Sequence, residues 1–570
     1  MPEAGESGGR PLRRLRAGLR SLRREGRKLA AEGWARLRRE GPDRAQFWIL
    51  ALVVGVAAGY AAIGFRLAIF ELQTLFYGVD DFELHTRLAA LSPWVVVGVP
   101  ILGGLAVGLL MRAFTEEGRV RNVSHVIEAA ALHDGRVPLR SGFASAGASL
   151  ITLSTGGSTG REGPVVHLAA VISSWVADRI QASPVTAREL MGCAVAAGVS
   201  ASFNAPIAGA VFALEVVLRH YALHAFAPIM VASIAGTVVS RVHMGDVTEF
   251  TLPEHSLGFY QELPAFLLLG IVCGLVAVAF MRAIFAAEDT ADRVQRLTRL
   301  PGWIRPGVAG AVLGVIALQF PHIIGVGYET TTRALTGGLS FSEAVIFAVV
   351  KAAAVAITVA GRMGGGVFSP ALMMGALTGL AFGQVAVGVF PSVSGSETLY
   401  ALAGTGALAA SVLGAPLSTA LIVFELTGDW QAGIAVLASV STAIVVSSRF
   451  VDRSFFLTQL ERRGIRLAEG PQSWLPRTIA VRDVMRLRGD ENGASDSACW
   501  ALIAQGAALD RNDTLAAALP LFERSAGRVM IPVVERRADG EPELLGALFH
   551  VDALKAYNRA LVETHREEHN

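Results

Sequence analysis

The chain has 570 residues, of which 52% are hydrophobic and only 17% are charged. Soluble globular proteins carry about 25% charged residues, so this composition indicates a membrane protein and argues against a large soluble one. The net charge of +2 says little about function. The three cysteines, Cys193, Cys273 and Cys499, are scattered without metal spacing and suggest no disulfide framework. We predict no metal site, no cofactor and no nucleic-acid partner.

The first 46 residues form a basic arm, with thirteen Lys or Arg against six Asp or Glu. The positive-inside rule predicts that this arm stays cytoplasmic. It is not a signal peptide, because its basic stretch is too long and no cleavage pattern follows. Two interpretations remain open, an amphipathic helix on the anionic inner leaflet and a solvated charged tail.

Residues 47–465 are predicted to lie in the membrane. Four uncharged runs, at 47–65, 92–111, 263–281 and 431–448, are each about as long as a helix that spans ~30 Å of hydrocarbon. Shorter apolar segments between them end in glycine or proline. Interrupted helices are tolerated where protein or a watery cavity satisfies the backbone. We therefore expect an all-α multi-pass membrane fold of broken helices, followed by a small α+β cytoplasmic tail at 466–570.

Two halves of this region resemble each other. Residues 203–215 (FNAPIAGAVFALE) and 413–425 (LGAPLSTALIVFE) share Ala-Pro and a Glu nine residues after the proline, 210 positions apart. Residues 160–170 and 366–376 both begin with a glycine and have a proline four residues later. They are separated by a similar number of positions. Matching interruptions in two halves indicate an internal duplication and point to a transport site. The residues do not tell whether the repeats are inverted.

The segment 154–170 (STGGSTGREGPVVHLAA) contains a carboxylate among small and apolar residues. Gly160, Gly163 and Pro164 predict a loop that enters a helix, because proline suits the first helical turn. The amides of a helix start carry partial positive charge and can bind an anion. Residues 366–370 (GVFSP) offer a second helix start, and two such ends would hold a halide weakly enough for it to leave.

Glu162 lies beside these predicted anion sites. When ionised it can occupy one of them as a tethered competitor, and when protonated it loses that attraction and swings out, so it would act as both gate and proton carrier. The alternative is a structural carboxylate paired with Arg161. Ionisable residues inside membranes are functional by default, which favours the gate.

The motifs GREGP (160–164), FNAP (203–206), GGVFSP (365–370) and FELTGDW (424–430) occur in this order. Together they resemble the CLC family of chloride channels and proton/chloride antiporters, over residues 47–465. The resemblance implies a membrane homodimer with one anion path in each subunit. It also implies that Glu162 is the external gating glutamate. The implied anion contacts are the segment Gly160, Arg161 and Gly163 and the backbones of Val367 and Phe368.

Two positions depart from the family pattern. The family's first anion motif, Gly-Ser-Gly-Ile-Pro, falls on residues 122–126 (NVSHV), so its serine becomes Val123, or Ser124 if the register shifts by one. The late tyrosine falls on Phe456. Without these hydroxyls the central site would keep backbone donors alone, and anion binding there should weaken. His125 is read as a structural residue, with a proton-carrying role as the alternative.

The inner proton position of the family's exchangers falls on Val216, which cannot carry a proton. This resembles the channel branch. Glu215, the preceding residue, remains as a candidate proton relay, and its repeat partner Glu425 is predicted to be structural.

The tail resembles part of a CBS domain, at 478–485 (TIAVRDVM), 514–535 and 546–557. Asp552 lies where such a motif often contacts a ribose. Two interpretations follow: an adenine-nucleotide site at Asp552, or a tail that stabilises a dimer.

The sequence thus predicts a gated pathway for chloride or similar small anions, channel-like or loosely coupled to protons. Proton-coupled chloride antiport is the alternative, and a non-transporting membrane sensor is the alternative from another class. No nucleophile–base pair or metal-ligand set suggests an enzyme. We expect a homodimer in a bacterial-type inner membrane, with both termini cytoplasmic.

Overall fold

The computed structural model describes residues 42–79, 83–115, 118–221, 223–245, 260–391, 394–467, 475–490, 492–523, 528–536 and 542–569. The basic arm predicted for residues 1–46 therefore lies outside the described residues up to position 41.

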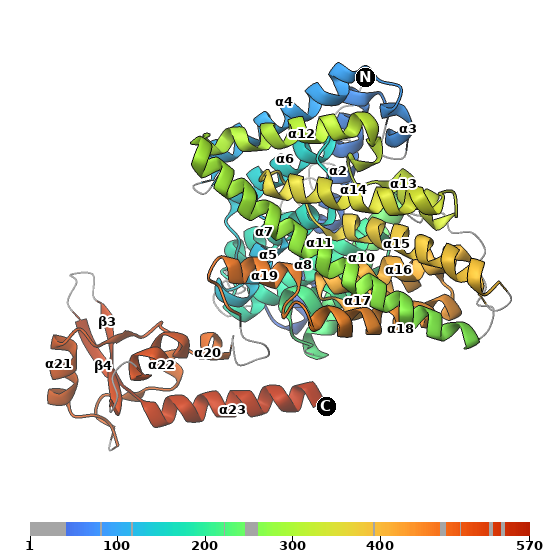
Figure 1. The fold of residues 1–570 in the computed structure, drawn as a ribbon. Helices are drawn as coiled ribbons and strands as arrows, with labels where there is room; N and C mark the ends of the chain where they lie inside the picture. The colour runs from blue at the N-terminus through green and yellow to red at the C-terminus, as the bar shows by residue number, and fades with distance from the viewer. Residues whose placement is uncertain are drawn as a thin grey trace, which may run out of the picture.

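Helices α2 to α19 build the large helical body in Figure 1. Their bounds are α2 Arg44–Tyr77, α3 Leu84–Leu88, α4 Pro93–Phe114, α5 Val123–Leu132, α6 Leu139–Ser154, α7 Glu162–Ile180, α8 Pro184–Phe203, α9 Pro206–Phe212, α10 Leu223–Met244, α11 Leu263–Thr298, α12 Arg305–Gln319, α13 Tyr328–Leu335, α14 Phe341–Ala360, α15 Phe368–Val389, α16 Glu397–Leu413, α17 Pro416–Thr427, α18 Trp430–Ser448 and α19 Phe455–Arg462. A π-helical segment, η1 (Ala213–Leu218), continues α9. Short 3₁₀ turns are η2 Tyr260–Glu262, η3 Gly302–Ile304 and η4 Pro321–Ile323.

Among the described residues, seven helices are long and apolar enough to cross a membrane: Arg44–Tyr77, Pro93–Phe114, Ala225–Met244, Leu263–Thr298, Gly302–Gln319, Phe341–Ala360 and Phe368–Val389. The spans predicted at 47–65, 92–111 and 263–281 are confirmed, as parts of α2, α4 and α11. The fourth predicted run forms α18, but it belongs with the shorter apolar helices. The body therefore mixes full spans with short helices, as the glycine and proline interruptions indicate.

The two repeated motifs hold each other in place. The amides of Ile207 and Ala208, at the start of α9, donate to the Glu425 carboxylate at 2.9 and 2.8 Å. The amides of Leu417 and Ser418, at the start of α17, donate to Glu215 at 2.9 and 2.8 Å. Each helix start is thus capped by a carboxylate from near the end of the other, so α9 and α17 run antiparallel. This relation is the one expected of inverted repeats.

Small residues let the helices of the second half approach closely. A Cβ atom added to Gly404 in α16 would lie 2.4 Å from the carbonyl oxygen of Gly375 in α15. One added to Gly379 would lie 2.2 Å from the carbonyl oxygen of Tyr400. Packing through small residues is the usual basis of helix association in membranes, and here it fixes α15, whose first residues belong to the site.

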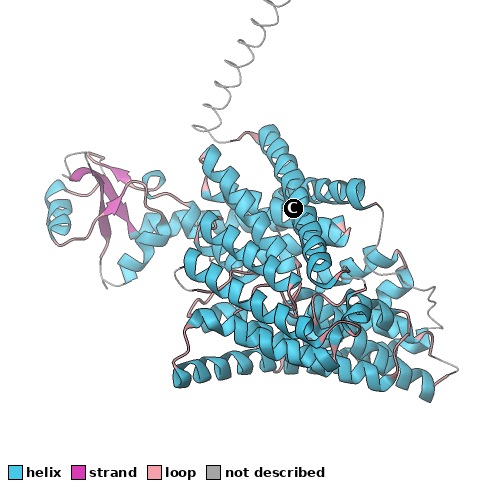
Figure 2. Cartoon of the chain, turned by 90° about the horizontal axis from the view of Figure 1, so that it is seen from above, coloured by secondary structure: helices cyan, strands magenta, loops and turns pink. Residues whose placement is uncertain are grey.

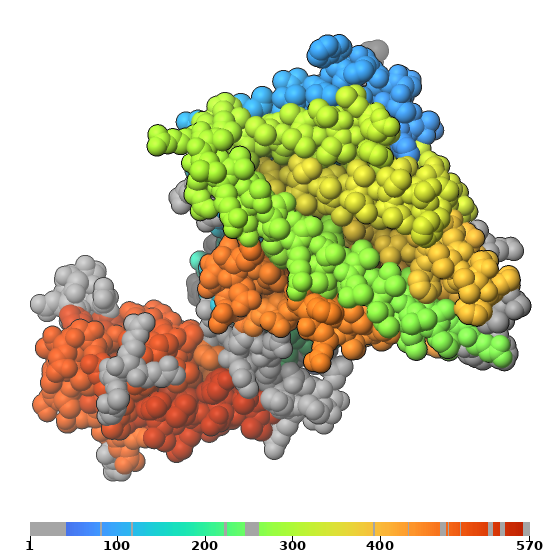
Figure 3. All heavy atoms as spheres, viewed as in Figure 1, coloured from blue at the N-terminus to red at the C-terminus, as the bar shows by residue number. Residues whose placement is uncertain are grey.

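The tail forms a small α+β lobe, visible beside the helical body in Figure 3. Its sheet, magenta in Figure 2, has the strand order β1-β4-β3-β2, with β2 parallel to β3 and the other neighbours antiparallel. Its elements are α20 Leu475–Thr478, η6 Val481–Asp483, β1 Arg486–Leu487, α21 Asp496–Ala504, β2 Leu509–Asp510, α22 Leu515–Glu523, β3 Met530–Arg536, β4 Pro542–Phe549 and α23 His550–His569. The predicted fold class is confirmed in both parts of the chain.

Candidate functional site

The loops that precede α7 and α15 are joined by backbone hydrogen bonds. The Gly160 amide donates to the Gly366 carbonyl at 2.7 Å, and the Gly366 amide donates to the Gly160 carbonyl at 2.8 Å. The Thr159 hydroxyl adds a bond to the Gly366 carbonyl at 2.8 Å. A Cβ on Gly163 would lie 3.0 Å from Gly366 Cα, so glycine permits this approach. The two predicted helix starts therefore meet, although 206 positions separate Gly160 from Gly366.

Neighbouring helices support this junction. The Thr358 hydroxyl, on α14, accepts a hydrogen bond from the Ser158 amide at 3.0 Å. The Thr152 hydroxyl, on α6, accepts one from the Gly364 amide at 3.1 Å. The loop before α7 and the loop before α15 are thereby each tied to a helix of the opposite half.

Glu162 is the first residue of α7 and is only 2% exposed. Its Oε1 accepts a hydrogen bond from the Ser369 hydroxyl, in the first turn of α15, at 2.5 Å. The carboxylate thus points from the start of one helix to the start of the other. Negative charge is stabilised at such helix ends by their unpaired amides.

Arg161 occupies the N-cap position of the same helix, but its side chain makes no capping hydrogen bond and points elsewhere. Its Nε lies 3.9 Å from Glu162 Oε1, at the outer limit of an ion pair. Its guanidinium donates to the Ser202 carbonyl at 3.2 Å and lies over the Tyr328 ring, 5.1 Å from the centroid. Glu162 Oε1 is therefore closer to the Ser369 hydroxyl, at 2.5 Å, than to Arg161 Nε, at 3.9 Å.

Val367 and Phe368 form the start of α15, as N-cap and first residue, and both are buried. The Phe368 ring packs against Phe203 and Phe212, with centroids 4.9 and 5.9 Å away. Phe203 belongs to FNAP, Phe212 ends α9 and Phe368 belongs to GGVFSP. Separate motifs of the sequence therefore meet at one place.

The segment 122–126 starts a third helix, α5, and the Asn122 side chain caps the N-terminal end of this helix. Asn122 Oδ1 accepts hydrogen bonds from the Ser124 amide at 3.1 Å and the Ser124 hydroxyl at 2.7 Å. His125 Nδ1 accepts from the Asn122 amide at 3.2 Å, which gives His125 a structural contact. Val123 is buried. The Ser124 hydroxyl is thus directed at Asn122.

A cavity of about 380 Å³ brings four predicted residues together: Val123, Ser124, Val367 and Phe456. Gly366 also lines it, so the cavity reaches the hydrogen-bonded junction with Gly160. The remaining lining is strongly charged. It includes Arg119, Arg305, Arg362, Arg462 and Arg463 and the acids Glu288, Asp289 and Asp292, together with uncharged residues such as Val359 and Gln459.

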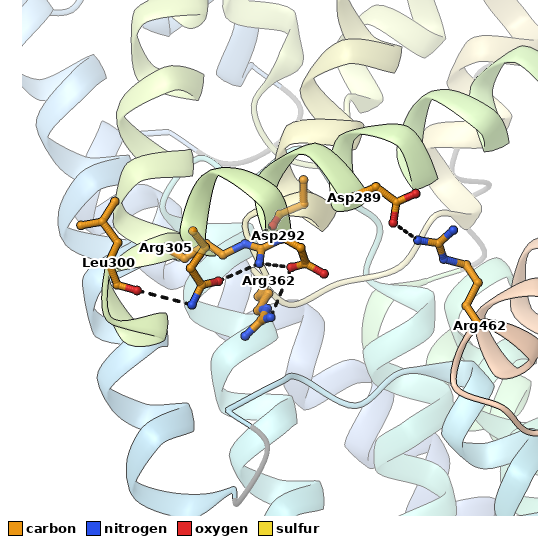
Figure 4. Close-up of polar contacts among 8 residues, drawn as sticks. Asp289, Asp292, Leu300, Arg305, Arg362 and Arg462 are labelled. Carbon is orange, nitrogen blue, oxygen red and sulfur yellow. Dashed lines mark hydrogen bonds and ion pairs between the residues drawn. The ribbon is translucent and has the colours of Figure 1, made fainter. Parts of the chain in front are cut away.

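Figure 4 shows how these charges are held together. Asp292, on α11, binds both Arg305 and Arg362, the latter at 3.4 Å, and Asp289 binds Arg462. One carboxylate thus serves two arginines, and the cavity wall keeps an excess of positive charge. No sequence pattern predicts this cluster, because its members come from α11, α12, α19 and the turn before α15 and share no motif.

Val216 and Glu215 lie in the π-helical segment η1. Val216 is 5% exposed and belongs to the apolar core. Both Glu215 oxygens accept hydrogen bonds from the start of α17, and the Ser418 hydroxyl adds a third at 2.7 Å. π segments are frequent at functional sites, but here the carboxylate is used as a helix cap.

In the tail, the Asp552 carboxylate accepts a hydrogen bond from Arg486 Nε at 2.7 Å. This bond raises the pKa of the Arg486 guanidinium above its ordinary range. The same guanidinium lies 4.2 Å from the Phe549 ring centroid. The residue predicted to contact a ribose therefore already has a cationic partner.

The comparisons with known proteins agree with the motif order. The family model described as voltage gated chloride channel matches residues 103–448. A ClcB-like chloride channel protein of Ralstonia nicotianae is 30% identical over 402 residues, which cover 70% of this chain and 92% of that protein. The chloride channel protein CLC-e of Arabidopsis thaliana is 30% identical over 424 residues, but these cover only 59% of its length and 70% of this chain.

A solved structure described as a slow cyanobacterial Cl⁻/H⁺ antiporter aligns with 73% of this chain and 97% of its own, with a TM-score of 0.64 and 23% identity. This likeness supports the fold. The family model covers more than half of the chain, and the Ralstonia protein is matched over nearly its whole length. The chain therefore belongs to the CLC family of voltage-gated chloride channels.

Proposed function

We propose that this protein moves chloride or similar small anions across the membrane, along a path in each subunit that passes the junction of α7 and α15. The observation that carries the proposal is the position of Glu162. This residue is only 2% exposed, and its carboxylate lies between the two helix starts, 2.5 Å from the Ser369 hydroxyl. A carboxylate bound there marks a place where negative charge is stabilised by helix ends and a hydroxyl.

Glu162 would gate this path by competition. Its ionised carboxylate occupies the junction and excludes the permeant anion. A protonated carboxyl group has no charge for the helix ends to attract, so it leaves and an anion takes its place. Helix ends and a hydroxyl would contact the anion, and the Arg161 guanidinium lies only at the outer limit of an ion pair, with Nε 3.9 Å from Glu162 Oε1. Binding of this kind is weak enough for the anion to leave again.

The charged cavity would supply the path with anions. Its lining has five arginines against three acids, and an excess of positive charge in a cleft raises the local anion concentration. Where the cavity meets the junction, Val367 and Phe368 offer backbone amides, whereas Val123 and Phe456 carry no hydroxyl. We propose that anions pass this inner position with weak binding.

The proposed mode is channel-like or loosely coupled to protons, because Val216 occupies the inner proton position. Glu215 fits a capping role, because its hydrogen bonds match those of Glu425 on the other half. Proton-coupled antiport is the second candidate, favoured by the protonatable Glu162 and by the antiporter described for the similar cyanobacterial structure. A sensor without transport is the third.

We further propose that the protein is a homodimer in a bacterial inner membrane, with both termini in the cytoplasm. The tail would stabilise the dimer rather than bind an adenine nucleotide, since Arg486 already engages the Asp552 carboxylate at 2.7 Å.

Chloride efflux from proteoliposomes, with the external pH recorded at the same time, tests the mode. We expect efflux without uphill proton movement, because Val216 interrupts the inner proton path. Proton uptake against its gradient, driven by chloride, would establish antiport instead. The absence of chloride efflux would support the sensor and overturn both transport readings.

Glu162→Gln tests the gate in the same assay. The amide resembles the protonated carboxyl group and cannot ionise, so we expect chloride efflux to lose its dependence on external pH. Glu71→Gln, on the exposed face of α2, is the matched control and should keep the native profile. A native pH profile in Glu162→Gln would remove this residue from the gate.

Glu215→Gln and Glu425→Gln form a matched pair that tests capping against proton relay. Each removes one charged cap, so we expect each to lower the free energy of unfolding by about 1 kcal/mol, measured in detergent, and to leave the pH dependence of efflux unchanged. If Glu215 relays protons, only Glu215→Gln will alter that pH dependence.

A further inference from the structure

Ser369 is the second residue of α15 and is 5% exposed. Its hydroxyl donates to Glu162 Oε1 at 2.5 Å, the length of a strong hydrogen bond to an ionised acceptor. Alanine at this position would fill nearly the same space without a donor.

The Ser369 amide nitrogen lies near the carboxylate. A Cβ atom added to Gly160 would lie 2.7 Å from Glu162 Oε2 and 3.1 Å from the Ser369 amide nitrogen. The second carboxylate oxygen and this amide therefore border the same small space, which glycine leaves open. The amide belongs to the first turn of α15, whose N–H groups have no acceptor within the helix. Ser369 thus binds the carboxylate through its hydroxyl, and its amide nitrogen lies at the edge of the same space.

The inner part of the path lacks such a pair. Val123 and Phe456 line the cavity without a hydroxyl, and the Ser124 hydroxyl donates to Asn122 at 2.7 Å. The hydroxyl donor that the inner site lacks is therefore present at the Glu162 seat instead.

We propose that the Ser369 hydroxyl determines anion binding and selectivity at this outer position: it holds the Glu162 carboxylate when the path is closed and the permeant anion when that carboxylate leaves. The inference rests on the proposed function and deepens it. A hydroxyl donor favours compact anions of high charge density, so Ser369 should favour chloride over a large anion such as thiocyanate.

The test uses the full chain with Glu162→Ala. In the native chain Ser369 would bind both the Glu162 carboxylate and the competing anion, so removing its hydroxyl would weaken both and hide the effect on the anion. Chloride binding is measured by titration calorimetry on purified protein. Adding Ser369→Ala should weaken chloride binding at least about tenfold, the lower end of what a hydrogen bond to a charged group contributes. It should weaken thiocyanate binding less.

Two further variants separate ligation from a structural role. Ser369→Thr keeps the hydroxyl and should restore most of the chloride affinity. Ser173→Ala removes a buried hydroxyl on α7 that bonds only within its own helix in the described structure, to the Ala170 carbonyl at 2.9 Å, and should leave the affinity unchanged.

Equal chloride affinities with Ser369→Ala and Ser173→Ala would overturn the role of Ser369. Equal losses for chloride and thiocyanate would also overturn it, because a general distortion of the site weakens both anions alike. If the Glu162→Ala protein itself neither binds nor transports anions, the proposed function fails instead, so the two failures are distinguishable.

Discussion

The pair of hydrogen bonds between Gly160 and Gly366 is the contact on which the site depends. It brings the starts of α7 and α15 together from opposite halves of the chain, at 2.7 and 2.8 Å. Without it, the Glu162 carboxylate would have one helix end near it rather than two. Glycines at 160, 163 and 366 are required because a Cβ at each would lie within 3.1 Å of a backbone or carboxylate atom across the junction.

Glu162, Glu215 and Glu425 each meet a helix start, and their surroundings differ. Glu215 and Glu425 each receive two backbone amides of a partner helix, and these reciprocal caps tie the two repeats together. Glu162 instead faces a hydroxyl and the junction of two helices, next to the path that we propose for anions. Removing the Glu215 or Glu425 carboxylate would leave a helix start without its cap. Removing the Glu162 carboxylate would instead open the position that we propose for an anion.

Much of this could be predicted from the sequence. The order of GREGP, FNAP and GGVFSP identified the family, and glycine followed by proline located both helix starts and Glu162 beside them. Three of the four apolar runs belong to helices that are long and apolar enough to cross a membrane. The direction of side chains could not be predicted, because it depends on contacts across the repeats. Ser369 lies inside a motif that was recognised, yet its bond to Glu162 appears only when the halves meet. The charged residues of the cavity wall in Figure 4 come from α11, α12, α19 and the turn before α15. No local sequence pattern joins these four segments.

If Glu162 gates by competition, a permeant anion can take the place of its carboxylate at the junction of α7 and α15. Anomalous diffraction from Glu162→Ala crystals soaked in bromide tests this exchange. We expect a bromide peak at that junction, within hydrogen-bond distance of the Ser369 hydroxyl, and no such peak in the native protein at alkaline pH. An empty junction in the variant, with bromide bound only elsewhere, would contradict it.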